Sequence, residues 1–216
     1  MNTTTHPVIR SGVLLGLIAL IGTALLAGVN ALTHERIAEQ EKRRVLQQLN
    51  ALVPVAYYNN DLLTDRVDIV DEAFFHHAEP VAVYRARMDD QPVAVLMTAT
   101  APDGYNGDIR LLIAVDTTGT ILGVRVVSHR ETPGLGDPIE IERSDWILSF
   151  TDKSLLNPRD DGWAVKRDGG DFDQFTGATI SPRAVVNAVH NTLVYFKANR
   201  KKLFETTANT ADRDDD

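Results

Sequence analysis

A polar stretch near the carboxyl end of the chain carries the residues best suited to hold an anionic ligand. It reads Asp-Gln-Phe-Thr-Gly-Ala-Thr-Ile-Ser-Pro over residues 173–182. Ser181 is a good helix N-cap and Pro182 suits the first helical position, so we expect the hydroxyls of Thr176 and Thr179 just ahead of a helix N-terminus. Free N–H groups and the positive end of the helix dipole favour an anion such as a phosphate there. An ordinary turn and cap is the plain alternative.

A second candidate is the loop Ser-His-Arg-Glu-Thr-Pro-Gly-Leu-Gly-Asp at residues 128–137. Its glycines and proline predict a loop of defined shape, in which backbone N–H groups near Gly134 and Gly136 could face a ligand at short range. A rigid loop that closes a hairpin explains the same composition. His129 and Glu131 could be read as a catalytic base pair, but no nucleophile lies nearby in sequence, so a hydrolase is not expected.

Two further groups carry weaker signals. Tyr105, in Gly-Tyr-Asn-Gly at 104–107, could stack on a planar ring, although an aromatic residue in a turn more often packs. The pair His76-His77 suggests a metal, but adjacent side chains diverge on a strand or a helix and do not easily share one ion. The glycine spacings match neither a Rossmann fingerprint nor a P-loop.

Composition excludes several classes of function. The chain has 216 residues, 44% of them apolar, and a net charge of -8, so it can build a core and is not expected to bind nucleic acid. It contains no cysteine. Disulfides, thiolate catalysis, cysteine-ligated metal clusters and a lipoprotein anchor are therefore excluded, and any electron transfer needs another kind of carrier.

Residues 11–32 form an uncharged apolar run. Roughly 20 such residues span a bilayer as a helix, whereas the apolar region of a cleaved signal peptide is about 7–15 residues long. We therefore prefer an uncleaved anchor, although Val29-Asn30-Ala31 weakly resembles a cleavage site. Arg10 precedes the run, and Arg36 with the basic residues at 42–44 follows it. The positive-inside rule then places the carboxyl side in the cytoplasm, but long domains can cross regardless of charge.

The remaining pattern predicts an α+β fold, a mostly antiparallel sheet flanked by helices. We expect strands near 82–88, 93–98, 109–115 and 122–126, with Arg85 and Arg87 on the polar side of the first. Helices are expected at 33–52, ended by Pro54, at 138–150 and at 182–204, and a short strand at 163–165. The predicted divisions are a tail at 1–10, a transmembrane anchor at 11–32, a stalk helix and connector at 33–70, a globular domain at 71–204 and a disordered acidic tail at 205–216.

Three segments in this order, behind one membrane span, resemble a known family. They are Gly-Tyr-Asn-Gly-Asp-Ile, His-Arg-Glu-Thr-Pro-Gly-Leu-Gly and Asp-Phe-Asp-Gln-Phe-Thr-Gly-Ala-Thr-Ile-Ser-Pro. Together they resemble the G subunit of the Rnf (Rsx) ion-translocating electron-transport complex. The C subunit of the sodium-translocating NADH:quinone reductase, which shares the FMN-binding domain, is a more distant relative.

The resemblance implies FMN joined through its phosphate to Thr179 by a separate flavin transferase. Transferase recognition would use Asp173, Thr176 and Gly177, with the small Ala178 leaving access to the hydroxyl. Many relatives have serine or alanine where this chain has Thr176. The ring pocket implied by the same resemblance is formed by Glu131, Thr132, Gly134, Leu135 and Gly136, with Tyr105 and Lys166 as further candidates.

The resemblance also implies partners and a location. The partners would be the other membrane and peripheral subunits of the complex, which passes electrons between reduced ferredoxin and NAD and couples them to sodium or proton movement. The globular domain would lie on the periplasmic side of a bacterial inner membrane, against the charge count above, and would carry electrons without independent catalysis. The alternative is an anchored, non-redox scaffold or small-ligand-binding module that uses the same groove without a covalent cofactor.

Overall fold

A computed structural model describes residues 5–75 and 80–205 of the chain. The chain divides into two compact units, Met1–Val45 and Leu46–Asp216. His76-His77 and nearly all of the acidic tail lie outside the described residues.

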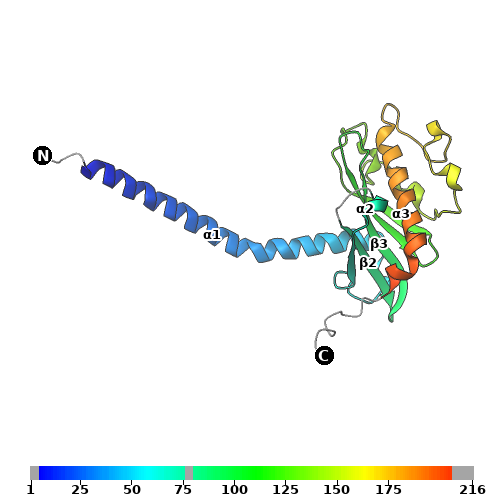
Figure 1. Cartoon of the computed structure of the whole chain (residues 1–216), viewed down its shortest axis with the longest axis horizontal. Helices are drawn as coiled ribbons and strands as arrows, with labels where there is room; N and C mark the ends of the chain where they lie inside the picture. The colour runs from blue at the N-terminus through cyan, green and yellow to red at the C-terminus, as the bar shows by residue number, and fades with distance from the viewer. Residues whose placement is uncertain (1–4, 76–79, 206–216) are drawn as a thin grey trace. The chain divides into compact units, whose positions relative to one another are not determined.

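Helix α1, Thr5–Asn50, contains the apolar run (Figure 1). Its segment Ile9–Val29 has 21 residues and a mean hydropathy of 2.4, and none of its most apolar window is buried within the structure. At the helical rise, that length is about 30 Å, the thickness of the hydrocarbon core of a bilayer. One helix in the described residues is thus long and apolar enough to serve as a single-pass anchor. The charged helix expected at 33–52 is its continuation and ends at Asn50.

The second unit contains a five-stranded antiparallel sheet in the order β1-β2-β3-β4-β5. The strands are β1 Arg66–Ile69, β2 Val81–Met88, β3 Gln91–Ala101, β4 Ile109–Asp116 and β5 Ile121–Ser128. The last four are the strands predicted from alternation, so the predicted α+β class is confirmed. β1 was not expected as a separate strand, because its four residues are too few to show a clear period.

Helix α3, Ile180–Phe204, covers one face of the sheet and packs on β3 and β4 (Figure 1). Val185, Val189, Leu193 and Phe196 recur at helical spacing and are buried in the main core. The short helix α2, Glu72–Phe75, adds Phe75 to this layer, with its ring 4.7 Å from that of Tyr195. The helix predicted at 182–204 is confirmed and begins two residues earlier.

The end of α1 and the segment after it belong to the globular unit. Leu49, Leu52, Val53 and Leu62 are buried but are not part of the core beneath α3. A Cβ placed on Gly123 would lie 2.8 Å from Leu52 Cδ2, so Leu52 packs directly on the sheet. Val124 follows Gly123 in β5 and belongs to the core beneath α3. Because adjacent strand residues face opposite sides of the sheet, Gly123 faces away from α3. We infer that residues 46–62 cover this opposite face. The compact unit therefore includes a segment that the sequence assigned to a stalk and connector.

Two arginines fix the carboxyl end of α3. Arg87 donates a hydrogen bond to the carbonyl of Phe204 at 2.8 Å, and Arg85 donates to that of Glu205. Both guanidinium groups pair with Asp65, at 2.6 and 2.7 Å. The alternation in the sequence did not reveal that both arginines are buried beneath the end of the helix. They satisfy helix carbonyls that would otherwise lack donors.

The prediction of one helix at 138–150 is wrong. The structure has two short 3-10 helices, η2 Asp137–Ile139 and η3 Asp145–Phe150. Ser144 separates them with an extended backbone, and its hydroxyl donates to the Pro138 carbonyl at 2.6 Å while accepting from Trp146 N at 3.2 Å. Such local side-chain bonds compete with a continuous helix. The strand predicted at 163–165 is reduced to one bridge, between Val165 and Phe172. The short helices η1 Val55–Tyr57, η4 Asp160–Gly162 and η5 Lys166–Asp168 complete the fold.

Replacing Leu49 by alanine tests whether the end of α1 is part of the folded unit. Leu49 is 0% exposed, so Leu49→Ala should lower the unfolding free energy by about 2–5 kcal/mol. Leu156, which is 86% exposed, supplies the matched control Leu156→Ala, which should have little effect. Both tryptophans lie in the unit, so their fluorescence during denaturant unfolding in detergent reports it selectively. Equal effects of the two substitutions would contradict this packing.

Candidate functional site

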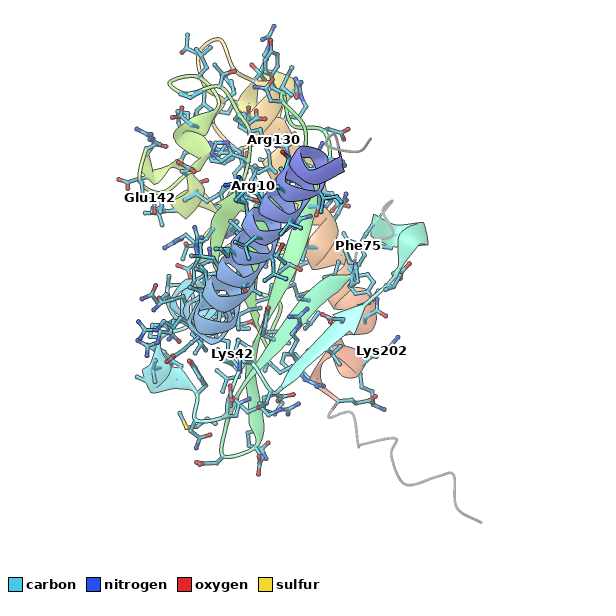
Figure 2. The ribbon with its side chains drawn as sticks, turned by 90° about the vertical axis from the view of Figure 1, so that its left-hand side faces the viewer. Arg10, Lys42, Phe75, Arg130, Glu142 and Lys202 are labelled. Carbon is cyan, nitrogen blue, oxygen red and sulfur yellow. The ribbon has the colours of Figure 1, made fainter. Side chains whose placement is uncertain are left out.

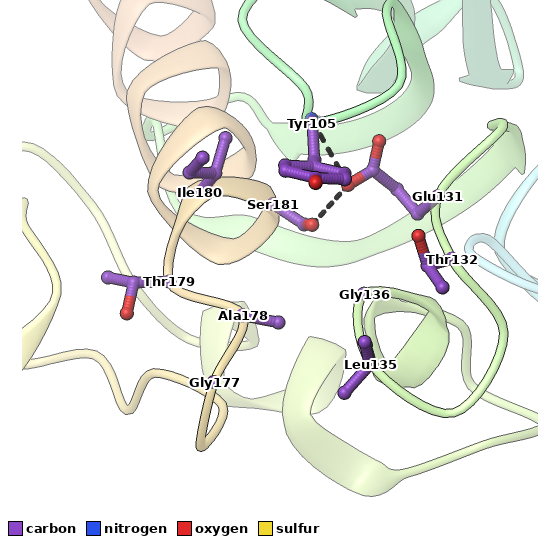
Figure 3. Close-up of a pocket in the computed structure, with 10 residues that line it drawn as sticks. All are labelled: Tyr105, Glu131, Thr132, Leu135, Gly136, Gly177, Ala178, Thr179, Ile180 and Ser181. Carbon is purple, nitrogen blue, oxygen red and sulfur yellow. Dashed lines mark hydrogen bonds between the residues drawn. The ribbon is translucent and has the colours of Figure 1, made fainter.

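A pocket of about 300 Å³ lies where three segments meet (Figure 3). The loop after β3 contributes Tyr105, and the start of α3 contributes the residues around Thr179. The loop after β5 contributes Glu131, Thr132, Leu135 and Gly136. These are the three stretches that the sequence analysis selected. Segments far apart in the chain therefore form one site.

The lining includes most of the residues expected from the sequence, namely Tyr105, Glu131, Thr132, Leu135, Gly136, Gly177, Ala178 and Thr179. It also includes Ile180 and Ser181, which the sequence analysis did not assign to the pocket. Ser181 was read only as a cap. The expected residues Gly134, Lys166, Asp173 and Thr176 lie outside the lining, and their proposed roles stay predictions.

The buried carboxylate of Glu131 connects the three walls. It is 4% exposed and accepts hydrogen bonds from Asn106 N at 3.0 Å, from Tyr105 N at 3.2 Å and from the hydroxyl of Ser181 (Figure 3). A buried carboxylate is stable only when donors of this kind surround it. Glu131 thus holds the β3–β4 loop and the first turn of α3 against its own loop.

The loop that carries Glu131 is closed by its own backbone bonds. Gly134 N donates to Asp137 Oδ1 at 2.6 Å, and Gly136 N donates to the carbonyl of Thr132 at 3.0 Å. The expectation that these N–H groups face a ligand was therefore wrong. A Cβ on Gly136 would lie 2.7 Å from Ser181 Oγ, so the glycine permits the close approach of the loop to α3. The exposed side chain that this loop gives to the pocket is Leu135.

His129 positions this loop and does not form a base pair with the Glu131 carboxylate. Its Nδ1 accepts from the backbone N–H of Glu131 at 2.9 Å, so Nε2 carries the proton and donates to Glu140 at 2.9 Å.

Thr179 lies at the first turn of α3 with its hydroxyl free of any capping bond. It is the residue before Ile180, and its side chain makes no cap interaction. Ser181 is not the N-cap that the sequence predicted, because its hydroxyl turns to Glu131. Gly177, with a φ of 80°, makes the bend that leads into the helix. The arrangement leaves a half-buried threonine in the pocket lining at a helix N-terminus.

Ion pairs hold the segment before Thr179. Lys166 Nζ lies 2.6 Å from Asp173 Oδ1, so the ammonium engages the motif carboxylate and is not among the pocket-lining groups. Asp168 binds Arg183 of α3 through two bonds of 2.6 and 2.9 Å. The hydrogen bonds from Arg183 lower the pKa of the exposed Asp168 carboxyl below its ordinary value, so this carboxylate is ionised at neutral pH.

Comparison with known proteins places this geometry in a family. Residues 104–194 match the FMN-binding domain family, and residues 1–52 match the family described as RnfG N-terminal region. Proteins named as the G subunit of an ion-translocating oxidoreductase complex are similar over almost their full length. The one from Shewanella loihica is 46% identical over 94% of this chain and 95% of its own, and the one from Pseudomonas aeruginosa strain UCBPP-PA14 is 48% identical over 93% and 94%. The one from Pseudoalteromonas atlantica is 43% identical over 92% of each chain.

The chain belongs to the G-subunit family of ion-translocating oxidoreductase complexes. The FMN-binding domain match contains every residue that lines the pocket. The match to the N-terminal region of the G-subunit family ends at residue 52, just after α1. The predicted family is therefore confirmed, and FMN is the ligand that its domain suggests.

Removing the Glu131 carboxylate should loosen the pocket. Glu131→Ala leaves Tyr105 N, Asn106 N and the Ser181 hydroxyl without their shared acceptor, and we expect a loss of at least about 2 kcal/mol in unfolding free energy. Glu142→Ala is the matched control, because Glu142 is exposed between η2 and η3 (Figure 2). Thermal unfolding followed by tryptophan fluorescence measures both variants. A Glu131→Ala protein as stable as the control would show that the carboxylate does not hold the walls together.

Proposed function

We propose that the chain is an FMN-carrying electron-transfer subunit of a membrane-bound ion-translocating oxidoreductase complex, with the FMN phosphate esterified to Thr179. The observation that carries the proposal is the position of Thr179, which lines the pocket at the N-terminus of α3 and whose hydroxyl makes no capping bond. The names of the relatives support the assignment to such a complex.

The side chains of the pocket suit a flavin. Tyr105, Leu135 and Ile180 line it and are exposed large apolar residues. Apolar and aromatic surfaces of this kind favour the flat faces of a tricyclic ring. When bound, the ring supplies the redox chemistry, while the protein orients it and limits its contact with water. The charge of Glu131 is buried and compensated by its hydrogen bonds. The large exposed side chains that remain for the ring are therefore the apolar ones.

The ester requires a separate flavin transferase, because a threonine hydroxyl is a poor nucleophile. Among the described residues, the side chain bonded to this hydroxyl is Arg167, which is a cation and not a base. Thr179 Oγ would form a bond to the FMN phosphorus of an activated donor, such as a flavin dinucleotide. The bond from that phosphorus to the departing nucleotide would break, and the hydroxyl proton would pass to a base of the transferase. This chain supplies the acceptor hydroxyl and access to it, since Gly177 and Ala178 carry little bulk before it.

The partners are the other members of the complex, which we propose couples electron transfer between reduced ferredoxin and NAD to the movement of sodium ions or protons. A covalent tether suits a membrane-anchored carrier, because the cofactor is retained even where free FMN is dilute. Asp173, Thr176 and Gly177 are proposed to be read by the transferase. Asp173 and Thr176 are exposed, and the ion pair between Asp173 and Lys166 has to open for direct contact with the carboxylate.

The choice of threonine can be tested by comparing two substitutions of Thr179 with a control elsewhere. Thr179→Ala, made in a host that has the transferase, should abolish the flavin fluorescence of the denatured protein band. Thr179→Ser should keep it, because a hydroxyl is retained. Thr151→Ala removes an exposed threonine hydroxyl outside the motif and the pocket and should leave the band fluorescent. Fluorescence that persists in Thr179→Ala, or is absent from the wild-type band, would rule out the proposed ester.

We further propose that the globular unit lies on the periplasmic side of the bacterial inner membrane and the amino terminus in the cytoplasm. The family relationship supports this side. The basic residues after the anchor argue for the opposite one, but charge bias is weak for long translocated domains.

The side can be measured directly, because the chain has no cysteine of its own. In cells with a permeabilised outer membrane, a membrane-impermeant maleimide should label Glu142→Cys. It should label Thr5→Cys, at the start of α1, only after the inner membrane is disrupted. The reverse pattern would place the globular unit in the cytoplasm.

A further inference from the structure

The turn η5, Lys166–Asp168, contacts the start of α3 and the segment 173–179 before it with its three successive side chains. Lys166 pairs with Asp173 and Asp168 pairs with Arg183, each with an N···O distance of 2.6 Å. Two of the local cations, Lys166 and Arg183, are therefore neutralised by carboxylates. The third cation is Arg167, which lies between Lys166 and Asp168 in sequence.

Arg167 directs its guanidinium to the hydroxyl of Thr179. Its Nη1 donates to Thr179 Oγ1 at 3.4 Å, and its backbone N–H donates to Gln174 Oε1 at 3.1 Å. In the described part of the chain, no carboxylate forms an ion pair with this guanidinium. A bond of 3.4 Å is at the long end for N–H···O, and a neutral hydroxyl is a weak acceptor for a full positive charge. The charge of Arg167 does act on the Asp168 carboxylate, where it adds to the effect of Arg183 in lowering the pKa, but the two side chains form no ion pair. Among the described residues, the guanidinium is thus placed at Thr179 without a direct ion pair.

The backbone of the turn is built tightly, so the point from which the Arg167 side chain starts is fixed. Gly169 ends the turn with a φ of 94°, and its N–H donates to the Lys166 carbonyl at 3.0 Å. A Cβ on Gly170 would lie 2.1 Å from the carbonyl oxygen of Ala164. Only glycine permits this close approach. The Asp-Gly-Gly sequence thereby accounts for a fixed turn, from which the exposed Arg167 side chain reaches Thr179.

We propose that Arg167 binds the phosphoryl group of the FMN carried by Thr179, and so positions the cofactor at the pocket. This inference rests on the proposed function. In the proposed ester, the phosphorus is bonded directly to Thr179 Oγ1, the atom that the guanidinium already contacts. The planar fork of arginine suits two phosphoryl oxygens at once, and the N-terminus of α3 adds favourable partial charge. Lys166 and Arg183 would have to break an ion pair to do the same.

A staple between η5 and α3, made only through the threonine hydroxyl, is the competing role for Arg167. The two roles differ in whether they depend on phosphate. FMN and riboflavin share the same ring and ribityl chain, and only FMN carries the phosphate. A phosphate-binding arginine therefore affects FMN alone, whereas a structural staple affects both flavins or neither.

The test measures dissociation constants of FMN and riboflavin for the full-length chain, purified in detergent from a host without the transferase. Wild type should bind FMN more tightly than riboflavin. Arg167→Gln should weaken FMN binding by about tenfold, the loss expected for one charge-assisted hydrogen bond, and leave riboflavin binding unchanged. Arg167→Lys should retain part of the difference. The control is Arg200→Gln, which removes an exposed arginine farther along α3 and should change neither constant.

The inference is overturned if Arg167→Gln weakens both flavins equally, changes neither, or if wild type shows no preference for FMN up to millimolar concentrations. Mass spectrometry after loading with the transferase separates this result from the proposed function. If the wild-type chain carries FMN on Thr179 but Arg167→Gln has no effect on binding, the proposed ester stands and the phosphate contact of Arg167 is refuted. If the wild-type chain is never loaded but Arg167→Gln weakens FMN binding alone, the ester is refuted and the phosphate contact stands.

Discussion

A buried carboxylate determines how the pocket is assembled. Glu131 has little contact with water, so its charge must be compensated by donors from the protein, and those donors come from the loop after β3 and from Ser181 in the first turn of α3. Because the other end of α3 is bound by Arg85 and Arg87, the helix is fixed at both ends. Thr179, immediately before it, then has a defined place at the rim of the pocket, set by the fold rather than by a ligand.

This construction explains how a modest, open pocket could serve a redox cofactor. A noncovalent flavin site needs enough contacts to offset the entropy lost on binding, but a cofactor joined to the chain does not depend on affinity. The pocket then has only to orient the ring, which the apolar residues Tyr105, Leu135 and Ile180 are suited to do. The exposure of those residues also suits a carrier whose ring must come close to electron donors and acceptors in neighbouring subunits.

Much of this could be predicted from the sequence, and the failures have physical causes. Most of the strands and the final helix follow from periodicity, the strand near 93–98 from a short apolar run, and the N-terminal apolar helix from the length of its uncharged run. The Thr179 motif and the loop at Glu131 were found by residue type and spacing. The sequence could not show that Ser181 bonds to Glu131 instead of capping α3, since both roles use the same hydroxyl and differ only in tertiary contacts. The burial of Arg85 and Arg87 could not be predicted for a similar reason, because it depends on helix carbonyls more than 100 residues away. Arg167 had no motif to mark it.

The central claim is that Thr179 carries FMN as a phosphoester. Peptide mass spectrometry of the chain isolated from the membranes of its own organism tests this most directly. The account predicts that the peptide containing Thr179 is heavier by one FMN less one water, and that fragmentation places the addition on that threonine. An unmodified peptide as the main species, or an addition on another residue, would contradict it.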